Sequence, residues 1–475
     1  MSIRKQLFLA VFTMITVFLF VFTGVFILEA AMPLPIAEAV RQALIYSPTL
    51  RAMKSEESAA VEQVGEARAM KAVKINLGID DTRTDSPMMA FGARLNQGNI
   101  STSDFAPDRL NAPGTINNLR ANLQIVAPIS LGGMDRNAVS SAREGVKIAN
   151  LDTLRARQEI IYRTIEIYLG AILARESVTV AEKACEGSVE SVRNAEAAVE
   201  AQRTVRSDLL QARVHHSQNE ENLLRRRNQY QLALDELAVI MGIPSAADFE
   251  LNMPFLQQNC VACGEAPEKL IGIALAKRPD YIKVSHQEAS FGNQECMARG
   301  MTRPHVSIGA AAEHNREDIG NAGHGNGLIF ARVDWNVADG GEARHKALMA
   351  RKKRDGLNDT AAAMADVIHL EIRTAITNIN NALERIRVSS EAVTQSEESL
   401  RILRDRYTAG LAIMSDLLES DNSLLSHRMN HLQALYDYAL SKARLKMALG
   451  ELTPEECEIL STTATVSSTL KTSAE

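Results

Sequence analysis

Residues 335–341 read Trp335-Asn336-Val337-Ala338-Asp339-Gly340-Gly341 and lie immediately before a long stretch without proline. The glycine pair repeats Gly132-Gly133 at an offset of 340 − 132 = 208 residues. At the same offset, Ser415-Asp416-Leu417-Leu418 repeats Ser207-Asp208-Leu209-Leu210. The register also holds at the end of the pattern, where Gly450 repeats Gly242. Matches that keep one register over more than a hundred residues indicate that the chain contains one structural unit twice.

Upstream of the glycine pairs the offset between the two copies changes. Pro48 matches Pro279, and 279 − 48 = 231. The first copy therefore carries 231 − 208 = 23 additional residues between Pro48 and Gly132. We expect each copy to form a helix, two strands, a long helix and a second helix. The first helix of copy one is expected over residues 35–72, with a bend at Pro48.

Four segments alternate apolar and polar side chains, which is typical of strands with two different faces. The strands are expected near residues 73–82, 118–127, 305–313 and 328–337. Segments of this length cross an outer membrane at a tilt, but a soluble sheet with one wet face would alternate in the same way. Within a membrane, four strands are too few to close a barrel, so several chains would have to share one.

After each glycine pair comes a segment that we expect to be one continuous helix. The two helices would run from Met134 to about Gln202 and from Glu342 to about Thr408, each on the order of 100 Å long. Apolar side chains in the second helix step by three and four residues, which is typical of a coiled-coil seam. A return helix over residues 415–449 would end at Gly450, as its counterpart ends at Gly242.

The start of the chain resembles an export signal. Arg4 and Lys5 precede an uncharged run over residues 7–28, followed by Ala30 and Ala31. We expect residues 1–31 to be a signal peptide, and a retained membrane anchor is the alternative, because about 20 apolar residues span a bilayer. The net charge of −6 does not favour nucleic-acid binding, and the aromatic content of 4% fits long helices packed on small side chains.

The remaining boundaries follow from the repeat. We expect a first structural repeat over residues 32–250, a linker over 251–266, a second repeat over 267–453 and a disordered tail over 454–475. Cys260 and Cys263 form a CxxC without a second pair at zinc-finger spacing, so a metal site is not expected. A local disulfide between Cys260 and Cys263 and two unpaired thiols are the two alternatives.

In several segments the chain resembles the TolC-like outer-membrane efflux protein family. The motifs include Pro128-Ile129-Ser130-Leu131-Gly132-Gly133, residues 335–341, Arg406-Tyr407-Thr408-Ala409-Gly410 and Asp416-Leu417-Leu418-Glu419-Ser420. Ala43-Leu44 with Ser47-Pro48-Thr49-Leu50 also matches, and residues 90–98 resemble the first external loop of many members. The resemblance covers residues 34–453, and its strength lies in the order of the motifs together with the repeat.

The resemblance implies a mainly α fold with a small membrane β part. Three chains would form a trimer with a 12-stranded β-barrel, continued through the periplasm by an α-barrel. The protein would be an outer-membrane exit duct of a Gram-negative bacterium for drugs, ions or secreted polypeptides. Its partners would be a periplasmic adaptor protein, an inner-membrane transporter of the RND, ABC or MFS type, and outer-membrane lipid, with no cofactor. The alternative is an exported coiled-coil or adhesin-like protein without a pore.

The resemblance also implies a functional site at the periplasmic tips of the helices, where acidic side chains line a constriction. By motif these positions are Asp416 and Glu419, with Asp208 and Gln211 as the equivalents in copy one. Carboxylates three residues apart share a helix face, and a ring of them favours cations. Asp416 would alternatively only cap its helix. The adaptor is expected to contact the same tips at Val205, Leu209, Gly410 and Leu417.

For two other candidate sites, the spacing of the residues indicates a structural role. Adjacent His215 and His216 point in different directions on a helix, so a solvated pair is expected. The glycine-rich residues 323–327 lie between two strands and are expected to form a hairpin loop rather than a phosphate site. The sequence contains no HExxH, GxSxG or P-loop motif, so an enzyme is not expected.

Overall fold

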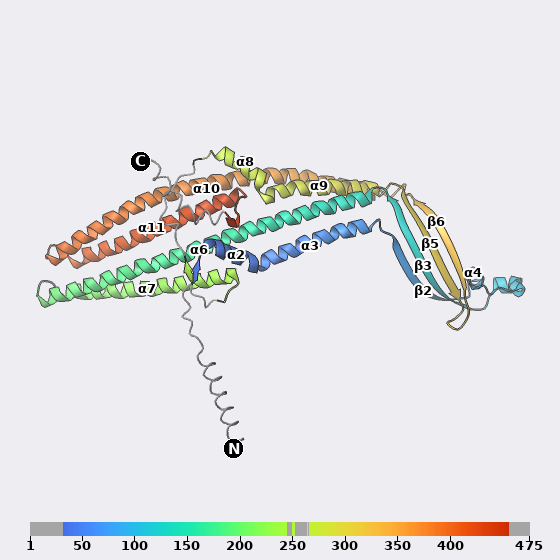
Figure 1. The fold of residues 1–475 in the computed structure, drawn as a ribbon, viewed down its shortest axis with the longest axis horizontal. Coiled ribbons are helices and arrows are strands. Elements are labelled where there is room, and N and C mark those ends of the chain that lie inside the picture. Colours follow the sequence, from blue (N-terminus) through green and yellow to red (C-terminus); the bar gives the residue numbers. More distant parts are fainter. Residues whose placement is uncertain (1–31, 245–248, 252–263, 265, 456–475) are drawn as a thin grey trace, which may run out of the picture. The chain divides into compact units, whose positions relative to one another are not determined.

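The structure is a computed structural model that describes residues 32–244, 249–251, 264 and 266–455 (Figure 1). The chain divides into two compact units, and each takes segments from both halves of the sequence. The helical unit comprises residues 1–47, 157–270 and 371–475, and the sheet unit comprises residues 48–156 and 271–370. The expected signal peptide, Cys260, Cys263 and nearly all of the expected linker and tail lie outside the described residues.

The two sequence copies form equivalent elements. In copy one these are α2 (Ile36–Tyr46), α3 (Pro48–Ala69), β2 (Lys74–Thr84), β3 (Ile116–Leu131), α6 (Met134–Glu200) and α7 (Arg206–Met241). In copy two they are α8 (Pro267–Lys277), α9 (Pro279–Gly300), β5 (His305–Arg316), β6 (His324–Asp334), α10 (Glu342–Thr408) and α11 (Met414–Ala448). Both long helices have 67 residues, and the bounds of α10 are those of α6 shifted by 342 − 134 = 208. The structure thus confirms the tandem repeat of strands and long helices.

The expected helix over residues 35–72 is two helices, so the prediction of a single bent helix was wrong. α2 ends at Tyr46 and α3 begins at Pro48, and Ser47 between them has a non-helical ψ of 117°. The ring of a proline clashes with a helical conformation of the preceding residue, and proline has no N–H for the helix ladder. Copy two breaks in the same way before Pro279, where Arg278 has a ψ of 121°.

The additional residues of copy one form the connection between β2 and β3. This connection contains α4 (Pro87–Asn96), the short 3-10 helix η1 (Thr102–Phe105) and α5 (Pro107–Asn111) (Figure 1). The buried carboxylate of Asp104 holds it together by accepting from the Ser101 backbone N–H at 2.8 Å and from Arg94 at 2.5 Å. The Ser101 hydroxyl also donates to Asp104, at 2.7 Å, and the two hydrogen bonds from Ser101 keep the pKa of Asp104 below its usual value, with the charge of Arg94 lowering it further.

The connection between β5 and β6 is shorter than the glycine-rich motif indicated. β6 begins at His324, so most of residues 323–327 belong to a strand and the predicted hairpin loop was wrong there. β6 also ends at Asp334, before Trp335 and Val337, which were expected to be in the strand. Glycine is compatible with extended backbone, and here the pairing of Asn326 with Glu313 extends the ladder to this end.

The four strands of the sheet unit form an antiparallel sheet in the order β2-β3-β5-β6 (Figure 1). The register aligns Ile75 with Ile125, Ile125 with Ala310, and Ala310 with Ile329, so apolar side chains share one face. Exposed members of this apolar face are Ile75, Leu77, Ile79, Leu123, Ile125, Ile308, Ile329 and Val333.

The opposite face of the sheet is mainly polar. Asp80, Arg120 and Asn315 are aligned across neighbouring strands there. Arg120 donates to Asp80 at 3.0 Å, and Asn118 donates to Asn315 at 3.0 Å. One sheet therefore presents an apolar surface on one side and a hydrogen-bonded polar surface on the other.

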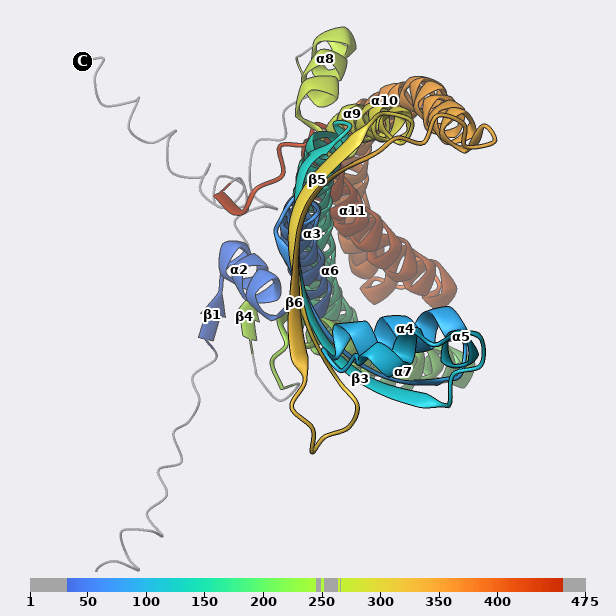
Figure 2. The same ribbon diagram turned by 90° about the vertical axis from the view of Figure 1, so that its right-hand side faces the viewer.

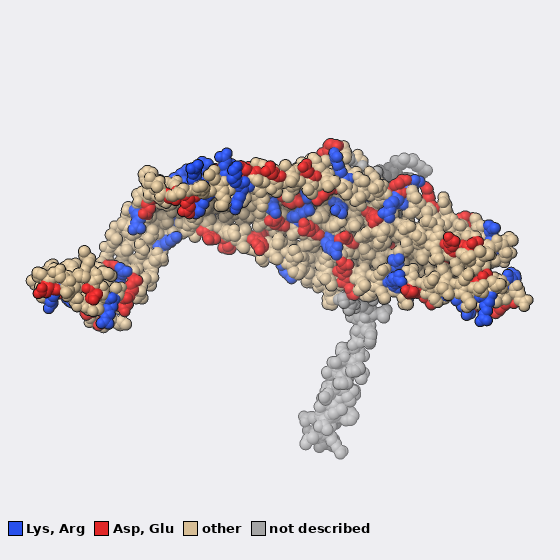
Figure 3. All heavy atoms as spheres, turned by 180° about the vertical axis from the view of Figure 1, so that it is seen from behind, with Lys and Arg blue, Asp and Glu red and all other residues tan. Residues whose placement is uncertain are grey.

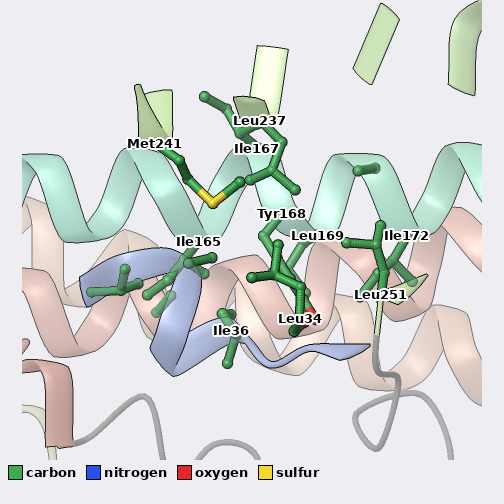
Figure 4. Close-up of a cluster of buried hydrophobic side chains, with 14 of the residues drawn as sticks. Leu34, Ile36, Ile165, Ile167, Tyr168, Leu169, Ile172, Leu237, Met241 and Leu251 are labelled. Carbon is green, nitrogen blue, oxygen red and sulfur yellow. Dashed lines mark hydrogen bonds between the residues drawn. The ribbon is translucent and has the colours of Figure 1, made fainter. Parts of the chain in front are cut away.

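The helical unit has its own hydrophobic core. A short parallel pair of β1 (Met32–Leu34) and β4 (Phe249–Leu251) lies beside α2 (Figure 2). Among its large side chains, Ile161, Ile165, Tyr168, Leu237 and Met241 are at most 1% exposed. Figure 4 shows Tyr168 on α6 pointing toward Leu34, whose carbonyl accepts from the tyrosine hydroxyl at 2.6 Å. This bond satisfies a buried polar group and attaches the first strand to the long helix.

Charged side chains of both signs are interspersed over the face of the molecule seen in Figure 3. Ion pairs within and between helices account for many of them, such as Arg385 with Asp437 and Arg213 with Glu196. Within the described residues, no helix combines the length and the apolar character that a bilayer-spanning segment requires.

Candidate gating site at the helix tips

Two tight turns join the long helices to the return helices in the helical unit, and they are built alike. In copy one the Arg203 N–H donates to the Ala198 carbonyl at 2.8 Å. In copy two the Leu411 N–H donates to the Arg406 carbonyl at 2.8 Å. Each bond connects residues five apart, as in the motif that ends a helix with one left-handed residue. The repeat therefore extends to single hydrogen bonds at the tips.

The left-handed position of the turn is filled differently in the two copies. Gly410 has φ 75° and Gln202, its equivalent, has φ 56°. Gln202 is the one residue other than glycine with a positive φ in the part of the chain that the structure describes. A side chain at this φ is strained, whereas glycine is not. The copy-two turn is thus free of this backbone strain.

The two tips pack against each other through a small apolar cluster, here called the tip cluster. It consists of Ala195, Ala212, Leu400, Tyr407, Met414, Leu417 and Leu424. Leu417 is only 3% exposed, so the single chain does not offer it as an adaptor contact, contrary to the expectation from the motif. Its side chain instead joins α11 to α10 and to the tip of copy one.

Asp416 and Glu419 lie on the first turns of α11 with exposed side chains. The alternative that Asp416 only caps the helix is not realised, because the N-cap residue is Ile413 and no side chain caps it. Both carboxylates are therefore available to water and to ions, on one face of the helix.

Asp208 has a different environment from its equivalent Asp416. It is partly buried, and the Thr204 hydroxyl donates to its Oδ2 at 2.5 Å. This bond connects the first turn of α7 to the loop before it. Gln211 is exposed and carries no charge. The structure places the four predicted constriction residues on the starts of two neighbouring helices, but only Asp416 and Glu419 form an exposed acidic pair.

Tyr407 is a tip residue whose buried environment the motif did not reveal. It belongs to the tip cluster, and its buried hydroxyl makes no regular hydrogen bond within the described residues. Burial raises the pKa of Tyr407, and the nearby Asp208 carboxylate raises it further. Its position at the end of a coiled-coil seam was visible in the sequence, but its closeness to Asp208 arises only when the two copies pack.

The expected adaptor-contact residues are only partly exposed. Val205 is 63% exposed and Gly410 lies at the surface, whereas Leu209 is partly buried against the tip cluster. Two further apolar residues of the copy-two turn, Leu411 and Ile413, are exposed as well. The turns thus present small apolar patches next to the acidic pair.

The prediction of a solvated histidine pair was wrong for His215. Its side chain is buried between α7 and α11, and its Nε2 lies 3.2 Å from the Asn422 Oδ1. His216 is partly exposed, and its Nδ1 lies 2.9 Å from the Ser188 hydroxyl. Helical spacing correctly separates the two rings, but it does not reveal which face another helix covers. In the described part of the chain, no group of three or more His, Cys, Asp or Glu side chains is arranged to hold a metal ion.

The repeat of two strands with long helices, together with the paired tips, defines a class of membrane channel. Residues 39–243 and 270–451 match the family model described as "Outer membrane efflux protein", and the chain belongs to this family. It is accordingly an outer-membrane protein of a family of passive channels and not an enzyme.

Individual relatives agree with this assignment. The chain is 21% identical to outer membrane protein TolC of Escherichia coli, over 88% of this chain and 83% of that protein. It is 23% identical to alkaline protease secretion protein AprF of Pseudomonas aeruginosa, over 69% of each. The fold is similar to the crystal structure of the Campylobacter jejuni CmeC outer membrane channel, with a TM-score of 0.73 and 16% identity over 90% of this chain and 89% of that one. Nothing in these comparisons favours the coiled-coil or adhesin-like alternative.

Proposed function

We propose that the chain is the exit duct of a tripartite efflux pump or a type I secretion system. In this role, three copies form one channel that conducts drugs, ions or secreted polypeptides passively to the exterior. A periplasmic adaptor and an inner-membrane transporter of the RND, ABC or MFS type deliver the cargo. We further propose that residues 1–31 direct export and that the two repeats span residues 32–250 and 267–453.

The two-sided sheet is the observation that carries this proposal. Its apolar face has exposed side chains such as Leu77 and Ile329, and its other face has the aligned Asp80 and Arg120. An apolar face is stable against lipid, and a polar face is stable against water in a conducting lumen. The outer strands β2 and β6 each have one partner strand within the chain, so neighbouring copies can pair with them.

We place the gate of the duct at Asp416 and Glu419. Three copies would bring six exposed carboxylates into a ring, which attracts and binds cations. Replacing both residues with alanine is expected to raise single-channel conductance severalfold in planar bilayers and to weaken block by divalent cations.

Asp359 and Asp366 provide the matched control, since both are exposed carboxylates of α10 that lie far along the helix from the tips. Replacing both of them with alanine removes the same charge and should leave conductance and block unchanged. Equal behaviour of the two double variants would refute the assignment of the gate.

We also place the adaptor contact at the two turns, on Val205, Gly410 and the partly buried Leu209. Gly410→Ala strains a left-handed backbone position and should reduce chemical crosslinking between the duct and its adaptor. The control is Gly356→Ala in the first quarter of α10, far from the tip, where an added Cβ meets open space. Undiminished crosslinking of the Gly410 variant would count against this contact.

A further inference from the structure

A groove between α9 and α10 of the sheet unit has an unusual lining. It has a volume of about 350 Å³, and its walls combine three guanidinium groups with small apolar side chains. These residues, which define the arginine groove, are Arg299, Arg344 and Arg351 together with Ala343, Ala347 and Leu348. Arg344, Leu348 and Arg351 are spaced by four and three residues, so they follow one stripe of α10.

The carboxylates of the groove neutralise only part of its positive charge. Glu295 is buried and already pairs with Arg299 at 2.5 Å and with Arg354 at 3.3 Å. Asp339 accepts from the backbone N–H groups of Gly341 at 2.9 Å and Ala343 at 2.7 Å, which keeps its pKa below the usual value. The negative charge of Asp339 therefore stabilises the N-terminus of α10.

Two arginines of the groove remain without an acidic partner. Among the described residues, neither Arg344 nor Arg351 forms an ion pair, and both are exposed. Nearby lysines of the same helix differ in this respect. Lys346 pairs with Glu342 at 2.6 Å and Lys352 with Asp355 at 3.7 Å. Free guanidinium groups beside an apolar wall suit an anionic group that carries hydrocarbon.

The groove also adjoins the end of the apolar sheet face. The single tryptophan of the chain, Trp335, follows β6 directly, is 60% exposed and donates from Nε1 to the Thr302 carbonyl at 3.1 Å. Thr302 lines the groove. Tryptophan is enriched where a membrane meets water, because its ring is apolar and its N–H is polar. If the apolar sheet face is embedded in lipid, Trp335 is placed where the lipid headgroups meet water.

We propose that the arginine groove binds the phosphate headgroup of an anionic phospholipid in the membrane leaflet on the helical side of the sheet. This inference rests on the proposed function, because it takes the apolar sheet face to be embedded in lipid. Arg299, Arg344 and Arg351 contact the phosphate, and Leu348 with the two alanines contacts the upper part of an acyl chain. A lipid bound in this way fixes the depth of each chain in the membrane.

The test is a titration of the full-length oligomer in non-ionic detergent, followed by native mass spectrometry. The probes are a short-chain phosphatidylglycerol, a phosphatidylcholine of the same chain length and inorganic phosphate. We expect preferential binding of phosphatidylglycerol, and a loss of about thirtyfold in its affinity in Arg344→Gln/Arg351→Gln. Lys346→Gln/Lys352→Gln removes equal charge from the same helix outside the groove and should stay within about twofold of the unmodified chain.

Three outcomes would overturn the proposal. They are equal binding of the two lipids, equal losses in the two double variants, and inorganic phosphate binding as tightly as the lipid. Conductance in planar bilayers, recorded for the same preparations, separates this inference from the proposed function. A conducting channel without lipid preference contradicts the groove alone, whereas a preparation that forms no channel contradicts the duct.

Discussion

Gln202 and Gly410 occupy the same place in the two tip turns, and only one of them is suited to it. A left-handed backbone costs a residue with a side chain about 1 kcal/mol relative to glycine. Copy one accepts this cost at Gln202, whose N–H donates to the Val199 carbonyl at 2.9 Å. The copy-one tip should therefore open more readily than the copy-two tip, whose turn is otherwise the same.

We predict that Gln202→Gly stabilises the copy-one tip by about 1 kcal/mol. The measurement is hydrogen–deuterium exchange at the Arg203 amide, which should exchange several times more slowly in the variant. The mirrored change Gly410→Gln should accelerate exchange at Leu411 by a similar factor. If neither amide responds, the positive φ does not limit the opening of these turns.

The place of a residue could be predicted from the sequence where a motif contains that residue. It could not be predicted where packing against another helix determines whether the side chain is buried. The motif placed Asp416 and Glu419 at a constriction, and their side chains are exposed at the start of α11. Leu417 lies between them in the sequence and was expected at the surface, but the helix periodicity turns it into the tip cluster. His215 is buried for the same kind of reason, because α11 covers its face of α7.

At the scale of the elements, a buried polar cluster lies between the helices behind the tip. Asp421 of α11 is at its centre, with a side chain only 14% exposed. Its Oδ2 lies 3.8 Å from the His215 Nε2 on α7, and its Oδ1 lies 4.0 Å from the Arg404 Nη2 on α10. The other charged groups that face this region are Arg428 on α11 and Lys183, Glu186 and Glu190 on α6. Burial outweighs these attractions and raises the pKa of Asp421.

The raised pKa of Asp421 determines how its contribution to the free energy of unfolding depends on pH. A carboxyl group whose pKa is raised on folding contributes stability at low pH, and that contribution is lost as pH rises through the folded-state pKa. Asp421→Asn should therefore raise the melting temperature of the oligomer at pH 7, where the ionised side chain is costly to bury. The advantage over the unmodified chain should shrink as the pH falls through the folded-state pKa of Asp421.

Calorimetry in detergent between pH 3.5 and pH 8 provides this comparison. Asp437→Asn is a suitable control, because this α11 carboxylate pairs with Arg385 at the surface. It should give no such gain at pH 7. A lower melting temperature for Asp421→Asn at pH 7 would mean that the contacts with His215 and Arg404 outweigh the cost of burial.

At the scale of the whole molecule, the four-stranded sheet of one chain has two edge strands without a second partner. β2 and β6 are its two edges, and both are long strands of 11 residues. Unpaired edges are costly in lipid, where backbone N–H and C=O groups have no water to bond. In the proposed duct, pairing β6 of one copy with β2 of the next would satisfy both edges, and closure after three copies would give a trimer.

Cysteine crosslinking tests this arrangement. Asn76 on β2 and Arg332 on β6 both lie on the polar face, near the ends of their strands that join the helices, and the five native cysteines would first be replaced by serine. With a short bifunctional thiol reagent, Asn76→Cys/Arg332→Cys should give a covalent trimer as the largest product. Each single variant should remain largely uncrosslinked. A dimer as the end product would contradict a trimer, and no product at all would contradict edge pairing.

The sequence by itself determined the repeat and the secondary structure of this protein. Glycine pairs, proline positions and hydrophobic periodicity act locally, so they predicted the long helices to within two residues at either end. The proline signal located the change of direction at Pro48 but predicted a bend where there are two helices. The early start of β6 was missed because strand pairing decides it.

Only the tertiary structure decided which side chains are covered. The burial of Leu417 and His215, the closeness of Tyr407 to Asp208 and the arginine groove all depend on residues that lie far apart in the chain. The physical reason is that helical spacing assigns a residue to a face, whereas burial and pKa depend on what packs against that face.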